Sequence, residues 1–126
     1  MATVQEFPEY DLFSKKCKLL LREKEIRFAG FVDQMGNLIV GGFKKGTPSL
    51  EDEVERQKIC LEIAVRTSMR MDFDHSLGLV QFTAARRKNA VMMSFPLGTS
   101  ILLISAKVDV DIESLAKKVM KIIHLA

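Results

Sequence analysis

Residues 77–106 read LGLVQFTAARRKNAVMMSFPLGTSILLISA and contain three short apolar segments, Leu77–Ala85, Ala90–Phe95 and Ile101–Ala106. Only Arg86–Asn89 and Pro96–Ser100 connect them. Connections this short leave no room for a crossover, so neighbouring segments are predicted to pair as antiparallel strands. The last segment is apolar at consecutive positions, which predicts a strand at the centre of the sheet with both faces covered.

Two further strands are predicted upstream. Ile26–Val32 and Leu38–Phe43 have strand-like patterns, and the connection between them contains Gly36, which can adopt positive φ in a hairpin turn. Gly30, Gly41 and Gly42 lie inside this hairpin. A glycine within a strand usually marks a bulge or the close approach of another backbone.

Three segments have apolar residues at helical spacing. The first is Glu9 to about Lys24, the second runs to about Met71, and the third follows Asp111 as its cap. The second helix is predicted to begin at Pro48, with Thr47 or Ser49 as its cap and acidic residues in its first turn.

The element order is therefore helix, strand, strand, helix, three strands and helix. This order predicts an α+β fold: a single five-stranded antiparallel sheet with helices on both faces. A chain of 126 residues without a linker or repeat is predicted to be a single domain spanning residues 1–126, with its core at about 9–124.

The composition is that of an ordinary globular protein, with 48% hydrophobic and 28% charged residues. No apolar run approaches the roughly 20 residues that a spanning helix needs, so no membrane insertion is expected. The segment Met1–Glu6 lacks the features of a secretory signal. Cys17 and Cys60 are predicted to be buried thiols in a reducing compartment, and a cytoplasmic location is expected.

The basic residues are clustered, although the net charge is only +3. The clusters are Lys15, Lys16 and Lys18; Lys44 and Lys45; Arg86, Arg87 and Lys88; and Lys117, Lys118 and Lys121. Such clusters are usually solvated surface, and they form a functional patch only where the fold brings several together. The residues proposed to contact a partner or an anion are Lys44, Lys45, Arg86, Arg87 and Lys88.

No pattern indicates catalysis, a metal or a cofactor. Gly41–Thr47 has the glycine spacing of a phosphate-binding loop, but the lysine and hydroxyl that should follow the second glycine are absent. Asp72 and Asp74 precede His75, and this arrangement is more typical of a polar loop than of a metal site. The protein is expected not to be an enzyme.

Three stretches carry a resemblance to the roadblock/dynein light-chain family of the profilin-like fold. They are the hairpin Phe28–Val40, the long helix from Pro48, and Met93–Gly98 leading into Ile101–Ala106. The resemblance spans about residues 10–124 and rests on apolar strands and glycine turns.

The resemblance implies a non-enzymatic scaffold or regulator, often of small Ras-like GTPases, that pairs with itself through the second helix and the edge strand after it. The corresponding surface here would be Glu53–Met71 and Leu77–Ala85. The dimer-interface residues predicted on this basis are Val54, Leu61, Val65, Leu79, Val80, Gln81, Phe82 and Thr83.

The edge strand itself supports this expectation. With the family's strand order, Leu77–Ala85 has no partner on one side, and it contains neither a proline nor a charge before Arg86. Monomeric proteins usually protect such an edge with lysine or proline. We therefore expect a homodimer whose joined surface holds another protein, with a small GTPase as the implied partner.

Two other functions stay open at this stage. A small-molecule sensor would need a cavity under the sheet, which Gly30, Gly41 and Gly42 would open. A nucleic-acid-associated protein would use the basic turns, but nucleic acid is not the favoured partner because few aromatic residues are free for base stacking.

Overall fold

A computed structural model describes residues 8–124 of the chain; residues 1–7, which include the N-terminal segment considered above, and residues 125–126 lie outside the described part. The strands are β1 (Ile26–Asp33), β2 (Leu38–Phe43), β3 (Thr83–Arg86), β4 (Val91–Leu97) and β5 (Ser100–Ala106). The helices are α1 (Pro8–Leu20), α2 (Glu53–Met71), α3 (Asp74–Leu77) and α4 (Ile112–Ile123).

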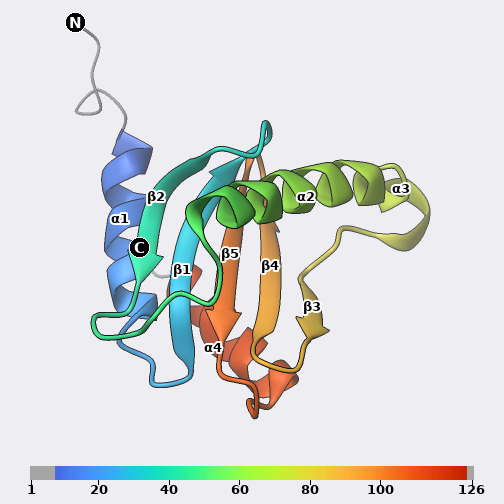
Figure 1. The fold of residues 1–126 in the computed structure, drawn as a ribbon. Helices are drawn as coiled ribbons and strands as arrows, with labels where there is room; N and C mark the ends of the chain where they lie inside the picture. Colours follow the sequence, from blue (N-terminus) through green and yellow to red (C-terminus); the bar gives the residue numbers. More distant parts are fainter. Residues whose placement is uncertain (1–7, 125–126) are drawn as a thin grey trace, which may run out of the picture.

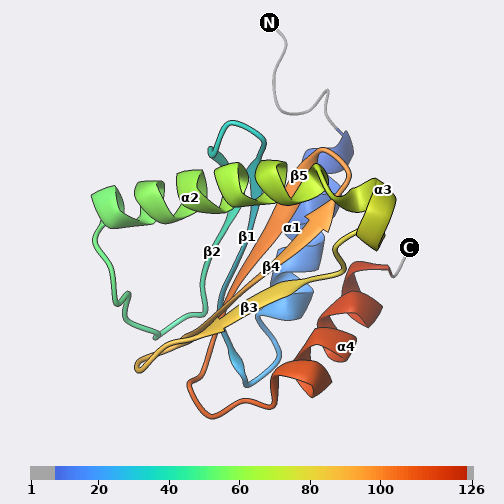
Figure 2. The same ribbon diagram turned by 90° about the vertical axis from the view of Figure 1, so that its right-hand side faces the viewer.

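The strands form one sheet in the order β2-β1-β5-β4-β3, and all neighbouring strands are antiparallel. Helices α1 and α4 cover one face, whereas α2 crosses the other (Figure 1, Figure 2). Every residue of β5 is buried, as its apolar sequence predicts for the central strand. The predicted fold class is confirmed.

Alternation along the central strands divides the core between the two faces. Leu102 and Ile104 of β5 face α1 and α4, where the rings of Phe13 and Phe31 also stack with centroids 4.0 Å apart. On the opposite face, Ile101 and Leu103 pack in one cluster with Phe28, Val32, Cys60 and Ala64. Cys17 and Cys60 are both free and buried, and burial raises the pKa of the Cys17 thiol to about 12. Neither thiol is therefore placed to react.

The strand glycines mark the close backbone approach that their positions predict. Gly30 and Gly41 are opposite each other in the β1–β2 ladder. A Cβ atom added to Gly41 would lie 2.3 Å from the Cα of Gly30, and Gly41 has φ +142°. In the turn, Gly36 has φ +87°, and a Cβ there would lie 2.8 Å from the Cα of Leu61, so the hairpin packs directly on α2.

Helix α2 begins later than predicted. Its cap is Asp52, not Thr47 or Ser49, and the Asp52 carboxylate accepts a hydrogen bond from the backbone N–H of Glu55 at 2.8 Å. The Glu55 side chain in turn accepts from the backbone N–H of Asp52. This reciprocal pair is a capping box that satisfies the backbone N–H groups of Asp52 and Glu55, and the helix starts at Glu53.

Helix α1 ends at Leu20, before the predicted end at Lys24. The backbone N–H groups of Arg22 and Glu23 bond to carbonyls three residues earlier, which is the pattern of a turn that closes a helix. Asp111 caps α4 as predicted, because its carboxylate accepts from the N–H of Ser114 at 2.9 Å.

The predicted strand Leu77–Ala85 is the main correction. Leu77 closes the short helix α3, which the predicted order lacks, and β3 begins only at Thr83. Leu79, Val80, Gln81 and Phe82 therefore lie outside the sheet ladder, although Phe82 still stacks on Phe95 with ring centroids 5.9 Å apart.

The geometry of β4 explains why β3 is short. Leu97 and Ser100 are paired across a two-residue turn, so their backbone groups point towards each other. Backbone groups alternate in direction along a strand, so those of Pro96 point towards β3. Proline has no N–H, and the pairing register would place Gln81 opposite it. The ladder loses a hydrogen bond at that position.

Candidate protein-interaction surface

Helix α2 is apolar on two sides. Cys60, Ala64 and Thr67 are buried against the sheet. A second side carries four exposed apolar residues at helical spacing, which we call the α2 stripe: Val54, Leu61, Val65 and Met69. Leu61, Val65 and Met69 are 52%, 50% and 62% exposed, so this side of the helix is solvated. A helix that packs on only one neighbour normally has a polar outer face.

The apolar surface continues beyond the end of α2. Phe73, Leu77 and Leu79 are also exposed, and Leu77 and Leu79 retain 82% and 79% of their accessible surface. A shallow groove runs along this side of the helix and is lined by Leu61, Val65, Met69 and Phe73 together with Lys58, Glu62, Arg66 and Arg70. A contiguous exposed apolar surface with a charged rim is typical of a protein-interaction site.

The charged rim of the groove is basic overall. Arg66 and Glu62 form an exposed ion pair at 3.2 Å along the helix, and such a pair adds little stability at the surface. Lys58 and Arg70 also line the groove. The stripe is therefore suited to an apolar partner surface with uncharged or acidic residues at its border.

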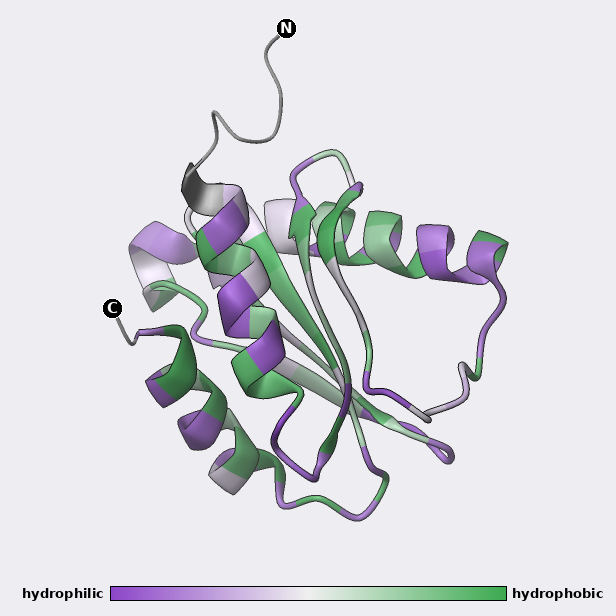
Figure 3. Cartoon of the chain, turned by 90° about the vertical axis from the view of Figure 1, so that its left-hand side faces the viewer, coloured by the Kyte–Doolittle hydropathy of each residue, from purple (hydrophilic) through white to green (hydrophobic). Residues whose placement is uncertain are grey.

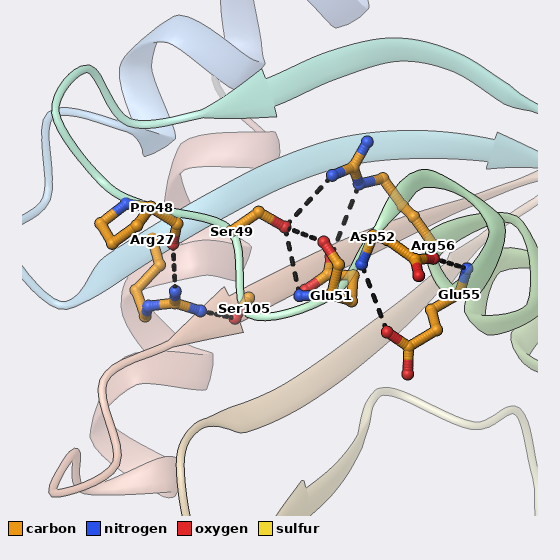
Figure 4. A network of polar contacts seen from close by, with 8 residues as sticks. All are labelled: Arg27, Pro48, Ser49, Glu51, Asp52, Glu55, Arg56 and Ser105. Atoms are coloured by element: carbon orange, nitrogen blue, oxygen red, sulfur yellow. Dashed lines mark hydrogen bonds and ion pairs between the residues drawn. The ribbon is translucent and has the colours of Figure 1, made fainter.

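A polar network anchors the N-terminal end of α2 to the sheet (Figure 4). The guanidinium of Arg56 lies 3.5 Å from the Glu51 carboxylate, donates to Ser49 at 3.2 Å, and sits 5.2 Å from the ring centroid of Phe43. Arg27 of β1 donates to Ser105 at 2.8 Å and to the carbonyl of Pro48 at 2.9 Å. These contacts fix the loop before α2 and hold the helix in place.

The exposed edge of β3 is the second part of the site. The backbone N–H of Arg87 donates to the carbonyl of Ala90 across a two-residue turn, so the backbone groups of these two residues point towards each other. By alternation, the backbone groups of Thr83 and Ala85 point towards β4, and those of Ala84 and Arg86 point outwards. The Thr83 hydroxyl also lies 2.5 Å from that of Ser94. The free edge is thus shorter than the sequence predicts.

The predicted interface residues fall into two groups. Val54, Leu61 and Val65 lie on the α2 stripe, and Thr83 lies on β3. Leu79, Val80, Gln81 and Phe82 belong to the segment between α3 and β3 instead of to a strand. Sequence reasoning missed Met69 and Phe73, although helical spacing from Val65 reaches both.

The basic turns are not brought together. Lys44 and Lys45 follow β2, whereas Arg86, Arg87 and Lys88 join β3 to β4 at the opposite edge of the sheet. Lys44 donates to the carbonyl of Glu23 at 2.6 Å. Arg86 donates to the carbonyls of Val108 and of Val110. Two of the five predicted cations therefore already serve as hydrogen-bond donors within the fold.

The other candidate sites considered from the sequence, a cavity at the strand glycines and a metal site at His75, do not form in the part of the chain that the structure describes. The space beside Gly30 is filled by Leu38 and Phe28, whose atoms would lie 2.8 and 3.0 Å from an added Cβ, so this glycine opens no cavity. His75 is exposed on α3. Among residues 8–124, no group of three or more His, Cys, Asp or Glu side chains is arranged to hold a metal ion, and no helix is long and apolar enough to cross a membrane.

Comparison with protein families matches residues 6–125 to a family of unknown function, DUF6659. The chain belongs to this family. No curated protein matches it in sequence.

The solved structures that resemble this DUF6659 chain share its fold at low sequence identity. The gliding protein MglB from Thermus thermophilus has a TM-score of 0.72 and 13% identity, over 93% of this chain and 87% of that one. MglB from Myxococcus xanthus has a TM-score of 0.69 and 12% identity, over 94% and 90% of the two chains. A roadblock/LC7 domain from Streptomyces avermitilis has a TM-score of 0.67 and 10% identity, over 87% and 90%. The DUF6659 chain has the roadblock/LC7 fold.

Proposed function

We propose that the protein is a non-enzymatic, homodimeric interaction module. The observation that carries the proposal is the α2 stripe with its continuation at Phe73, Leu77 and Leu79, an apolar surface that a monomer leaves in water. The second copy is the occupant that the adjoining β3 edge favours, because an unpaired strand pairs readily with an identical strand.

Antiparallel pairing of two β3 edges would join the two sheets around a two-fold axis. Both α2 helices would then lie on the same face of the combined sheet, with their apolar residues available to each other and to a third protein. A scaffold that holds another protein follows from this arrangement, and a small Ras-like GTPase is the partner class that the roadblock resemblance implies. We place the module in the cytoplasm, consistent with its two free cysteines.

A matched pair of proline substitutions tests the edge. Ala84→Pro removes a backbone N–H that points outwards, so we expect monomers with nearly unchanged stability. Ala85→Pro removes an N–H that points to β4, and we expect it to destabilise the fold by about 3 kcal/mol. Sedimentation velocity and urea denaturation would separate the two effects. An Ala84→Pro protein that remains a dimer would rule out pairing through β3.

The third-protein claim needs its own test. A purified small Ras-like GTPase, loaded with GDP or a GTP analogue, would be titrated into the labelled protein. We expect binding that Val65→Asp weakens at least tenfold, because a charge would be placed in an apolar contact. Leu12→Asp, which places a charge at an exposed position of α1 on the other face of the sheet, is the control. Equal binding by both variants would contradict the proposed surface.

A further inference from the structure

The face of the molecule opposite α2 carries a concentration of cations. Six exposed basic side chains belong to α1, to the turn after it and to α4: Lys15, Lys18, Arg22, Lys24, Lys117 and Lys121. None of the six forms an ion pair with another described residue. Figure 3 views this side, where hydrophilic residues recur along the outer surfaces of both helices.

The fold gathers clusters that are far apart in the sequence. Lys16 of α1 donates to the carbonyl of Ile123 at the end of α4, which joins the two helices. The hydrogen bond from Lys44 to the carbonyl of Glu23 places the end of β2, with exposed Lys45, next to the turn after α1. Three of the four basic clusters in the sequence therefore meet on one side.

The nearby carboxylates are largely occupied. Lys118 of α4 lies 3.3 Å from the Glu23 carboxylate and 3.1 Å from that of Glu25. The carboxylate of Asp111 caps α4. Among the side chains of these segments whose burial the structure describes, the other exposed acids are Asp11 near the start of α1, Asp109 before α4 and Glu113 in the first turn of α4. The six exposed cations therefore outnumber the exposed acids that are described there.

We propose that the α1/α4 face binds peripherally to an anionic lipid surface. The cations are distributed along two neighbouring helices, as suits a broad surface of phosphate groups, and each lysine or arginine near such a membrane contributes a roughly fivefold gain in affinity. Leu12, also exposed on α1, adds an apolar contact at headgroup depth.

Nucleic acid is the less favoured anionic partner. Binding of single strands usually needs aromatic rings on which bases stack. The ring of Phe13 on α1 is already stacked against Phe31 in the core, and Tyr10 is half-buried. Binding to lipid would leave the α2 stripe facing away from the membrane and free for a protein partner. The proposal therefore goes beyond the proposed function and does not depend on the dimer.

Vesicle co-sedimentation of the full chain tests the proposal. We expect binding to phosphatidylcholine vesicles that contain phosphatidylserine, no binding to phosphatidylcholine alone, and release at high salt because screening shortens the range of the attraction. Lys15→Glu/Lys18→Glu and Lys117→Glu/Lys121→Glu should each weaken binding more than tenfold. Circular dichroism would show that these surface variants remain folded.

A control of equal net charge distinguishes a specific face from general basicity. Gln34→Glu/Ser76→Asp/Asn89→Asp/Thr99→Glu lowers the net charge by the same amount through exposed neutral residues outside α1 and α4, and it should bind vesicles like the parent. Equal weakening in this variant and in the two lysine variants would overturn the proposal. Absence of binding to anionic vesicles, or tighter binding to duplex DNA than to those vesicles, would overturn it too.

Discussion

At the scale of single residues, the β1–β2 hairpin depends on a glycine pair. Gly41→Ala would place a Cβ 2.4 Å from the carbonyl oxygen of Ala29 in addition to its contact with Gly30, at a φ that side chains rarely adopt. We expect a loss of about 1–3 kcal/mol in the free energy of unfolding. Gly42→Ala is the control, since nothing lies within 4 Å of its added Cβ. Urea denaturation would measure both, and equal stability of the two variants would contradict the proposed close approach.

The turn of the same hairpin makes stability depend on pH. Burial by itself raises the pKa of Asp33, but hydrogen bonds from Asn37, Met35 and Gly36 outweigh it, and the pKa is lowered. A carboxyl whose pKa is lower in the folded state stabilises the fold above its unfolded pKa of about 3.9, and this contribution is lost as pH falls through the folded value. The parent should exceed Asp33→Asn in stability at neutral pH, and the difference should narrow as the pH falls below about 4. A difference that stays constant with pH would refute this role.

Sequence reasoning at this scale succeeded where the cause is local. Gly36 in a turn and Asp111 as a helix cap follow from conformational preferences that neighbouring residues suffice to define. The Asp52 cap was missed because Ser49 and Thr47 are equally good caps by type. The choice among them depends on how the preceding loop is tied to the sheet through Arg27 and Arg56.

At the scale of elements, the length of β3 is set by its neighbour. Restoring an N–H with Pro96→Val should extend the ladder, because that group points towards Gln81 in the register of β3 and β4. By NMR, we expect the amide of Gln81 to exchange more slowly than in the parent, and the amide introduced at position 96 to exchange slowly. Pro48→Val, in the loop before α2, should leave exchange at Gln81 unchanged. Rapid exchange at residue 96 in the first variant would show that another cause ends β3.

Strand β3 also shows what sequence patterns alone do not predict. The residues of Leu79–Phe82 favour a strand by type, and nothing within the segment itself forbids one. The missing donor belongs to Pro96, and its direction depends on a pairing register that sequence alone does not define. In contrast, the central position of β5 was predictable because a short, uninterrupted apolar run is typical of a strand that is covered on both faces.

At the scale of the whole molecule, two faces have different chemistry. The α2 side exposes apolar surface, and the α1/α4 side exposes cations. The fold class and strand content were predictable from element order, but this division was not. It depends on which side of each helix is turned outwards after packing, and Val65 is exposed although its residue type favours burial.

The central claim is that the α2 stripe and the β3 edge pair two copies of the chain. Sedimentation equilibrium of the parent protein at tens of micromolar tests it most directly, since one copy has a mass of 14.2 kDa. We predict twice that mass for the parent and for Leu12→Asp, and the single mass for Val65→Asp at the same concentration, because a charge in the apolar contact opposes pairing. A parent protein that sediments as a single copy would contradict the claim.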